Sequence, residues 1–131
     1  MKKLSEIYKA LGIGFTFPIE IKDDNGNETY YEGSKGYWEI CEYDANSNQT
    51  YHEDSDGYWY RREYDTNGYV DYFEDSDGYW QKYERDANGY LTYYEDSDGY
   101  WYRREYDANG YQTYYEDSEG YKRGTPKSTN Q

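Results

Sequence analysis

The sequence predicts an all-β protein, an antiparallel up-and-down meander of two-stranded repeats, each 21 residues long. One turn glycine recurs on this spacing without a break, at Gly36, Gly57, Gly78, Gly99 and Gly120. A second turn recurs on the same spacing, as Asp23-Asp24-Asn25-Gly26, Asp44-Ala45-Asn46-Ser47, Asp65-Thr66-Asn67-Gly68, Asp86-Ala87-Asn88-Gly89 and Asp107-Ala108-Asn109-Gly110. The segments between the turns are rich in tyrosine and tryptophan, which favour strands.

Composition sets the kind of sheet to expect. The chain has 131 residues, room for one domain, and contains 23 tyrosines and 4 tryptophans but few aliphatic residues. Its mean hydropathy of -1.51 is typical of chains that stay disordered. Aromatic side chains bury large areas, so we expect an ordered sheet without a thick aliphatic core.

The formal net charge of -14 bears on partners and location. It disfavours direct binding to nucleic acid or to an anionic membrane surface, and it favours a basic protein partner, cations or simple solubility. No secretory signal is evident after Lys2 and Lys3, because the charged residues Glu6 and Lys9 interrupt the segment after them. The single cysteine, Cys41, suits a reducing compartment, so we expect the protein in the cytoplasm.

Residues 1–22 form the predicted lead-in to the array. Within 1–14, Leu4, Ile7, Tyr8 and Leu11 share one face of a short helix. Such a helix either caps one end of the repeats or docks a partner, and the cap is favoured because repeat arrays need covered ends. From Phe15 to Lys22 the pattern indicates an edge strand, since Pro18 disfavours a central one.

Residues 23–124 form the predicted five-unit array of about ten strands. One strand type is represented by 90–95 and the other by 100–106, joined by the tight turn Asp96-Ser97-Asp98-Gly99. Tyr102 and Arg104 fall on one face and Trp101 on the other, so both faces mix aromatic and charged residues. This indicates a thin or curled sheet held by cross-strand pairs. Lys122 replaces tryptophan in the last repeat, and we expect 125–131 to be a disordered tail.

The strand and turn of each repeat resemble the tyrosine–aspartate (YD) repeats of rearrangement-hotspot (Rhs) proteins. The matching residues are Gly99 with Tyr106-Asp107-Ala108-Asn109-Gly110, and Gly57 with Tyr64-Asp65-Thr66-Asn67-Gly68. Arg85 and Ser47 depart from the pattern. Large members of that family form β-shells around toxins or mediate surface contacts. Small acidic chains of this type resemble proteins of phages and mobile elements, which implies a small inhibitor or accessory protein acting in a bacterial host.

No catalytic set is predicted, and no cofactor is implied. His52 occupies the position that holds Tyr31, Phe73, Tyr94 or Tyr115 in the other repeats, so it is interpreted as a framework variant. Cys41 occupies the position of Arg62, Tyr83 and Arg104, and is likewise interpreted as incidental. A cysteine nucleophile needs a base and an orienting group, and the sequence indicates neither. The protein is therefore expected not to be an enzyme.

Calcium binding is the metal hypothesis to weigh. Three repeats fit the last part of an EF-hand loop: Asp54, Asp56, Gly57 and Glu63; Asp75, Asp77, Gly78 and Glu84; Asp96, Asp98, Gly99 and Glu105. The first ligand position, however, holds His52, Phe73 or Tyr94, none of which is a calcium ligand. We therefore predict no dedicated metal site.

The candidate binding site is a row of acidic turns along one edge of the meander, with tyrosines beside them as apolar anchors. It comprises Asp54, Asp56, Asp75, Asp77, Asp96, Asp98, Asp117 and Glu119, with Tyr79 and Tyr100. Such a row could imitate a phosphate backbone and occupy the positive surface of a nucleic-acid-handling protein. Alternatively, these charges only keep the sheet soluble and prevent the edges of two sheets from pairing. Where such pairing is not prevented, the protein could form a homo-oligomer through its sheet edges.

A second hypothesis concerns the tryptophans. If Trp59, Trp80 and Trp101 were exposed in a row, they could stack on sugar rings, as in a surface or saccharide-binding module. Packing within the sheet is the favoured interpretation, because such a sheet has little else to bury.

Overall fold

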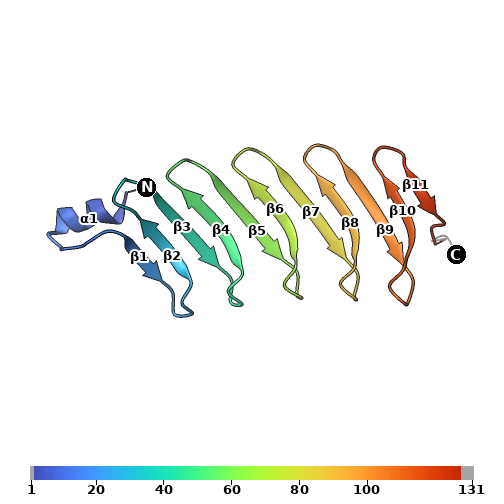
Figure 1. The fold of residues 1–131 in the computed structure, drawn as a ribbon, viewed down its shortest axis with the longest axis horizontal. Coiled ribbons are helices and arrows are strands. Elements are labelled where there is room, and N and C mark those ends of the chain that lie inside the picture. The colour runs from blue at the N-terminus through green and yellow to red at the C-terminus, as the bar shows by residue number, and fades with distance from the viewer. Residues whose placement is uncertain (1, 128–131) are drawn as a thin grey trace. The chain divides into compact units, whose positions relative to one another are not determined.

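A computed structural model describes residues 2–127 of the chain. These residues form one helix and eleven strands, and every strand neighbours the next in sequence order within one antiparallel sheet (Figure 1). The sheet is not closed, because β1 and β11 have a neighbour on one side only. The predicted all-β meander with a short N-terminal helix is confirmed, with eleven strands where about ten were expected.

The elements follow the repeat closely. They are α1 (Leu4–Leu11), β1 (Ile19–Lys22), β2 (Glu28–Glu32), β3 (Trp38–Tyr43), β4 (Gln49–Asp54), β5 (Trp59–Tyr64), β6 (Val70–Asp75), β7 (Trp80–Arg85), β8 (Leu91–Asp96), β9 (Trp101–Tyr106), β10 (Gln112–Asp117) and β11 (Lys122–Gly124). No helix within residues 2–127 is long and apolar enough to span a membrane.

The chain divides into two compact units. The first comprises Met1–Arg62 with Asp75–Asp77, and the second comprises Glu63–Glu74 with Gly78–Gln131. The first unit therefore contains α1, β1 to β4 and most of β5, together with the tip of one acidic turn. The second contains β7 to β11 and most of β6.

The two kinds of turn share one geometry. At the acidic turn, the Gly99 N–H donates to the Asp96 carbonyl (3.0 Å), while Asp96 Oδ1 accepts from two backbone N–H groups further along. At the other end of β9, in the turn that leads to β10, the Gly110 N–H donates to the Asp107 carbonyl. Asp107 Oδ1 accepts the N–H groups of Asn109 and Tyr111. Such Asx turns need a left-handed residue at the fourth position, and Gly99 supplies it with φ 87°. Aspartate and glycine together therefore explain why the repeats turn where they do.

Successive hairpins are joined by serine as well as by the strand ladder. In the second unit, the Ser97 N–H donates to the Trp80 carbonyl (2.9 Å), and the Trp80 N–H donates to Ser97 Oγ (3.1 Å). The same reciprocal pair recurs between Ser118 and Trp101 in that unit, and in the first unit between Ser55 and Trp38 and between Ser76 and Trp59. Each acidic turn is thus fixed to the tryptophan of the preceding hairpin.

Burial is shallow, as the composition predicts. Among the described residues, the buried apolar and aromatic side chains are Ile19, Tyr30, Cys41 and Tyr114. The tryptophans are half-buried within their own units, so they are neither enclosed nor fully exposed. In the second unit Tyr94 stacks on Tyr102 across β8 and β9, with ring centroids 5.2 Å apart. Cross-strand aromatic pairs therefore replace an aliphatic core.

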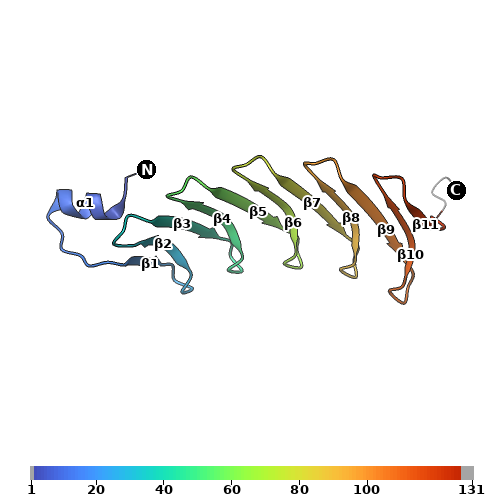
Figure 2. The same cartoon turned by 45° about the horizontal axis from the view of Figure 1, so that its top comes forward.

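The N-terminal segment is shorter in helix than expected. α1 covers Leu4–Leu11 of the predicted 1–14 and ends at Gly12, which has the left-handed φ of 70°. Leu11 is exposed, although it shares the predicted apolar face of the helix with Leu4, Ile7 and Tyr8. β1 is an edge strand as predicted, but it begins after Pro18 rather than around it. Figure 2 shows α1 near the end of the sheet that β1 forms, and the N–H of Ser5, in its first turn, donates to Glu32 of β2.

The C-terminal end has little regular secondary structure. β11 is three residues long and exposed throughout, and residues 125–127 form neither helix nor strand. The Lys127 N–H nevertheless donates to Glu105 Oε1 at 2.9 Å, so this part of the predicted tail lies against β9. The rest of the predicted disordered tail, 128–131, lies outside the described residues.

Candidate functional site

The two acidic residues of each acidic turn have different surroundings. The first residue is turned into the fold. In the second unit Asp96 and Asp117 are buried, each accepts two backbone N–H groups through Oδ1, and each accepts a tyrosine hydroxyl through Oδ2 at 2.9 Å. The donors are Tyr94 and Tyr115, two residues earlier on the same strand. These two carboxylates therefore hold their turns in shape.

The first unit repeats this arrangement with substitutions. Asp54 accepts the N–H of Asp56 through Oδ1 (2.9 Å), and its Oδ2 lies 3.1 Å from His52 Nε2. Burial works to raise the pKa of Asp54, but the contact with His52 and the backbone N–H groups outweigh it, so the pKa is lowered. Asp75 accepts the N–H of Asp77 (2.9 Å) and the hydroxyl of Tyr58 (3.2 Å).

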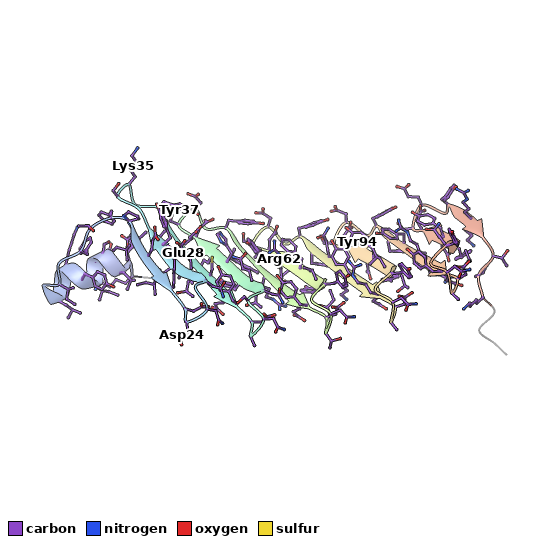
Figure 3. The ribbon with its side chains drawn as sticks, turned by 60° about the horizontal axis from the view of Figure 1, so that its bottom comes forward. Asp24, Glu28, Lys35, Tyr37, Arg62 and Tyr94 are labelled. Atoms are coloured by element: carbon purple, nitrogen blue, oxygen red, sulfur yellow. The ribbon has the colours of Figure 1, made fainter. Side chains whose placement is uncertain are left out.

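The second acidic residue of each turn faces solvent. Asp56 and Asp77 are exposed in the first unit, and Asp98 and Glu119 are exposed in the second. The first repeat differs, because Lys35 extends outward from the turn between β2 and β3, at the opposite end of that hairpin from Asp24 (Figure 3). Half of the predicted acidic site is therefore available to a partner, and the other half is engaged within the fold.

Tyr79 and Tyr100, predicted as anchors, belong to a tyrosine cluster in the second unit. The Tyr100 hydroxyl lies 3.2 Å from that of Tyr115, and the Tyr79 hydroxyl lies 3.4 Å from that of Tyr94. The Tyr100 hydroxyl, burial and Asp117 together raise the pKa of Tyr115 well above its usual range. Burial, followed by the contact with Tyr79, does the same for the pKa of Tyr94. Both predicted anchors are half-buried, so only part of each ring faces solvent.

A second constellation, which the sequence analysis missed, lies on the opposite side of these strands. Tyr93 donates its hydroxyl to Glu95 Oε1 (3.2 Å), and Trp101 lies opposite Glu95 in the ladder with its ring stacked against Tyr93. We call such a tyrosine, glutamate and tryptophan a Tyr–Glu cell. The first unit contains two, Tyr51 with Glu53 and Trp59, and Tyr30 with Glu32 and Trp38. The signal was the pattern Tyr-x-Glu, shared by all three cells, which places the tyrosine two residues before the glutamate on the same face of the strand.

The first cell is occupied by the chain itself. The Leu4 N–H donates to the Tyr30 hydroxyl (3.1 Å), the Ser5 N–H donates to Glu32 Oε1 (3.1 Å), and the Ser5 hydroxyl donates to Glu32 Oε2. Glu32 is 1% exposed. Burial works to raise the pKa of Glu32, but the hydrogen bonds from Ser5 and Tyr30 and the charge of Lys3 outweigh it, so the pKa is lowered.

Arginines on the two sides of β9 have contrasting environments. Arg103 donates to Glu105 (2.9 Å) and to Glu116 (3.0 Å), which fixes it on the side of the Tyr–Glu cell. Arg104 lies on the other side over the ring of Tyr102, with its guanidinium carbon 4.6 Å from the ring centroid, and its Nε is buried without a hydrogen bond among the described residues. Stacking on tyrosine is therefore the main stabilising contact of Arg104.

The structure brings Cys41, His52 and Asp54 into one line. Cys41 lies opposite His52 in the β3–β4 ladder, with Sγ 3.8 Å from Nδ1, and His52 Nε2 faces Asp54. Thiol, imidazole and carboxylate follow in the order used by cysteine nucleophiles. However, burial and then Glu39 raise the pKa of the Cys41 thiol, whereas a reactive cysteine needs a lowered pKa and solvent access. His52 also makes the contact with Asp54 that tyrosine makes in other repeats.

Residues 2–127 contain no assembled metal site, because no three His, Cys, Asp or Glu side chains among them lie close enough together to hold an ion. In the repeat that fits the EF-hand pattern at Asp96 and Asp98, Glu105 is bonded to Arg103 and to the backbone of Lys127 instead of facing the acidic turn.

One surface recess stands beside the cell of the second unit. It has a volume of about 520 Å³ and is lined in part by Glu84, Tyr93, Arg103, Glu105 and Lys127. Its lining combines charged side chains of both signs with the rings of Tyr93 and Tyr106. The recess therefore suits a segment of polypeptide that presents both polar and apolar groups.

Comparison with known proteins finds no protein-family model and no curated protein sequence that matches this chain. The resemblance to YD repeats therefore stays a prediction drawn from the motif.

Proposed function

We propose that this protein is a non-enzymatic acidic binding protein of the phage or mobile-element type, which occupies the positive surface of a basic, nucleic-acid-handling protein in a bacterial cytoplasm. The observation that carries the proposal is the exposure of Asp56, Asp77, Asp98 and Glu119 at the turns of a chain with a net charge of -14. A partner that binds nucleic acid offers the complementary positive groove.

The turn geometry supports a preorganised surface. The first aspartate of each turn fixes the backbone, and the serine of the turn fixes it to the preceding hairpin. The exposed acid that follows the serine is therefore presented at a defined position, which lowers the ordering cost of binding. Long-range attraction brings the basic partner in, and the acidic turns then block its nucleic-acid site.

The test neutralises the four exposed acids without touching the turn aspartates, as Asp56→Asn, Asp77→Asn, Asp98→Asn and Glu119→Gln. Affinity capture from bacterial lysate is expected to recover a nucleic-acid-binding protein that added duplex DNA displaces. Capture should weaken as salt rises, since exposed charges are screened beyond about 8 Å at physiological ionic strength. The neutralised variant should lose this protein.

A matched control removes the same number of charges elsewhere, as Glu6→Gln, Glu20→Gln, Glu42→Gln and Glu84→Gln, all at exposed positions. It should retain most of the capture. Equal loss in both variants would reduce the acidic turns to a contribution to net charge and solubility. Recovery of no basic partner by the unmodified protein would contradict the proposal.

The alternative function is a saccharide-binding module. It is favoured by the half-buried tryptophans that lie against tyrosines, as Trp101 does with its ring 20° from the plane of Tyr93. A half-exposed ring of this kind can stack on a sugar face. Binding on a glycan array that Trp80→Ala abolishes would favour this function over the first.

A further inference from the structure

We propose that the Tyr–Glu cells at Tyr51–Glu53 and Tyr93–Glu95 are docking sites for the first turn of a helix that begins with the pattern Lys-x-Ser and belongs to another protein. The occupant is read from the chain itself, because the first turn of α1, with Lys3, Leu4 and Ser5, fills the equivalent cell at Tyr30–Glu32. This surface is separate from the exposed acids of the acidic turns.

The three cells have matching geometry. The tyrosine hydroxyl donates to the glutamate at 2.8 Å in the occupied cell, and at 2.9 Å and 3.2 Å at Glu53 and Glu95. In all three, a tryptophan stands directly opposite the glutamate in the ladder. Each cell therefore offers the same carboxylate, partly oriented by its tyrosine.

The occupied and open cells differ in what the carboxylate still lacks. Glu32 is buried and accepts three hydrogen bonds, two of them from Ser5. Glu53 and Glu95 are half-buried, and within residues 2–127 each accepts a side-chain hydrogen bond from its tyrosine alone. A carboxylate has about four acceptor positions. Most of this capacity remains for the N–H groups and the serine hydroxyl of an incoming helix.

Charge favours a helix N-terminus as the occupant. The first N–H groups of a helix have no partner within the helix, and the helix dipole places partial positive charge there. A glutamate beside them is complementary, and a preceding lysine adds to the attraction, as Lys3 does for Glu32. A glutamate of the second unit also accepts a backbone N–H from a segment outside the strands, because the Lys127 N–H donates to Glu105.

The occupied and open cells also differ in one neighbouring residue. The residue opposite the tyrosine is Ile40 in the occupied cell, but Arg61 and Arg103 in the open ones. The open cells therefore lack this apolar neighbour, and an incoming helix is held there by its first turn. In the second unit, the recess of about 520 Å³ beside Tyr93 gives such a helix room.

The test uses a synthetic peptide with the sequence of residues 2–14, added to the intact protein and followed by NMR shifts and by calorimetry. The peptide should bind and shift the signals of the two open cells. The double variant Glu53→Gln, Glu95→Gln should weaken binding about tenfold, because hydrogen bonds to a charged acceptor are lost. Ser5→Ala within the peptide should weaken binding to the unmodified protein similarly.

Three controls separate docking from general attraction. A scrambled peptide keeps the charge and should bind poorly. Asp24→Asn removes an exposed acid outside the cells, and Asp98→Asn removes an acid of an acidic turn. Binding of the native peptide should survive both substitutions. Equal binding of the scrambled peptide, or unchanged binding in the Glu53→Gln, Glu95→Gln variant with its circular dichroism intact, would overturn the inference. Because Asp98→Asn tests the acidic turns alone, failure of either proposal is recognised independently.

Discussion

An aspartate carboxylate and a left-handed fourth residue define the turns of the array, except that the turn between β2 and β3 has Gly33 in place of the aspartate. Glycine takes the fourth position in most turns, but Ser47 adopts a φ of 65° in its place. Left-handed backbone costs an ordinary residue roughly 1–2 kcal/mol. Ser47 recovers part of this, since its hydroxyl accepts a hydrogen bond from Asn27 Nδ2 at 2.9 Å. Residue identity at a single turn position therefore bears directly on stability.

Replacing the strained serine should stabilise the protein. Ser47→Gly is expected to raise the free energy of unfolding by about 0.5–1 kcal/mol, because relief of the left-handed strain exceeds the loss of one exposed hydrogen bond. Urea unfolding measures the change. The reverse substitution at the equivalent position, Gly68→Ser with a native φ of 88°, should lower stability. A lower stability of Ser47→Gly would show that the contact with Asn27 dominates.

At the scale of elements, the unit of construction is a hairpin tied to the one before it. The ladder joins neighbouring strands, and the serine of each acidic turn adds two hydrogen bonds to the preceding tryptophan. The acidic turn is therefore also a connector between hairpins. This explains why a sheet with so few buried residues can keep its turns in register.

Removing one connector should weaken the array locally. Ser97→Ala deletes the acceptor for the Trp80 N–H (3.1 Å) and is expected to lower the free energy of unfolding by about 1 kcal/mol. Ser34 is the matched control, since it holds the same repeat position but is exposed and makes no hydrogen bond within the described residues. Ser34→Ala should be nearly silent in the same urea titration. Equal effects at both positions would contradict the connector role.

In the whole molecule, tyrosine side chains provide the packing that aliphatic side chains provide in most domains. The rings stack across strands, and their hydroxyls donate to carboxylates on both sides of the strands. Burial, followed by neighbouring carboxylates, raises the pKa of many of them, among them Tyr51, Tyr58 and Tyr93. In the first unit, burial raises the pKa of Tyr30 to about 12. Stability is therefore linked to the protonation of tyrosine.

Alkaline pH should destabilise the fold. A tyrosine whose pKa is raised on folding contributes stability that is complete below the unfolded value of about 10 and is lost as pH rises through the folded value. The midpoint of thermal unfolding is thus expected to fall steadily from about pH 10 upward, with phenolate absorbance appearing at the same transition. An unchanged midpoint up to the pKa of Tyr30, about 12, would contradict this link.

The fold could be predicted from the sequence because the repeat spacing and the turn residues determine it. The glycine at every 21st residue and the Asp-x-Asn-Gly turns fix strand length and direction locally, so the meander, its edge strand and its thin core could be predicted. The exposed acids Asp56 and Asp98 were also found this way. These are all properties of one repeat and its immediate neighbours.

Only the tertiary structure decided which acid does what. Sequence alone could not separate Asp96 from Asp98, because burial of Asp96 depends on Tyr94 reaching it along the strand. Nor could the sequence alone place α1 on Tyr30 and Glu32. The contact joins Ser5 to Glu32, 27 positions apart, and no repeat relates these two residues. Long-range contacts of this kind depend on the path of the chain in space, and periodicity describes only the path along it.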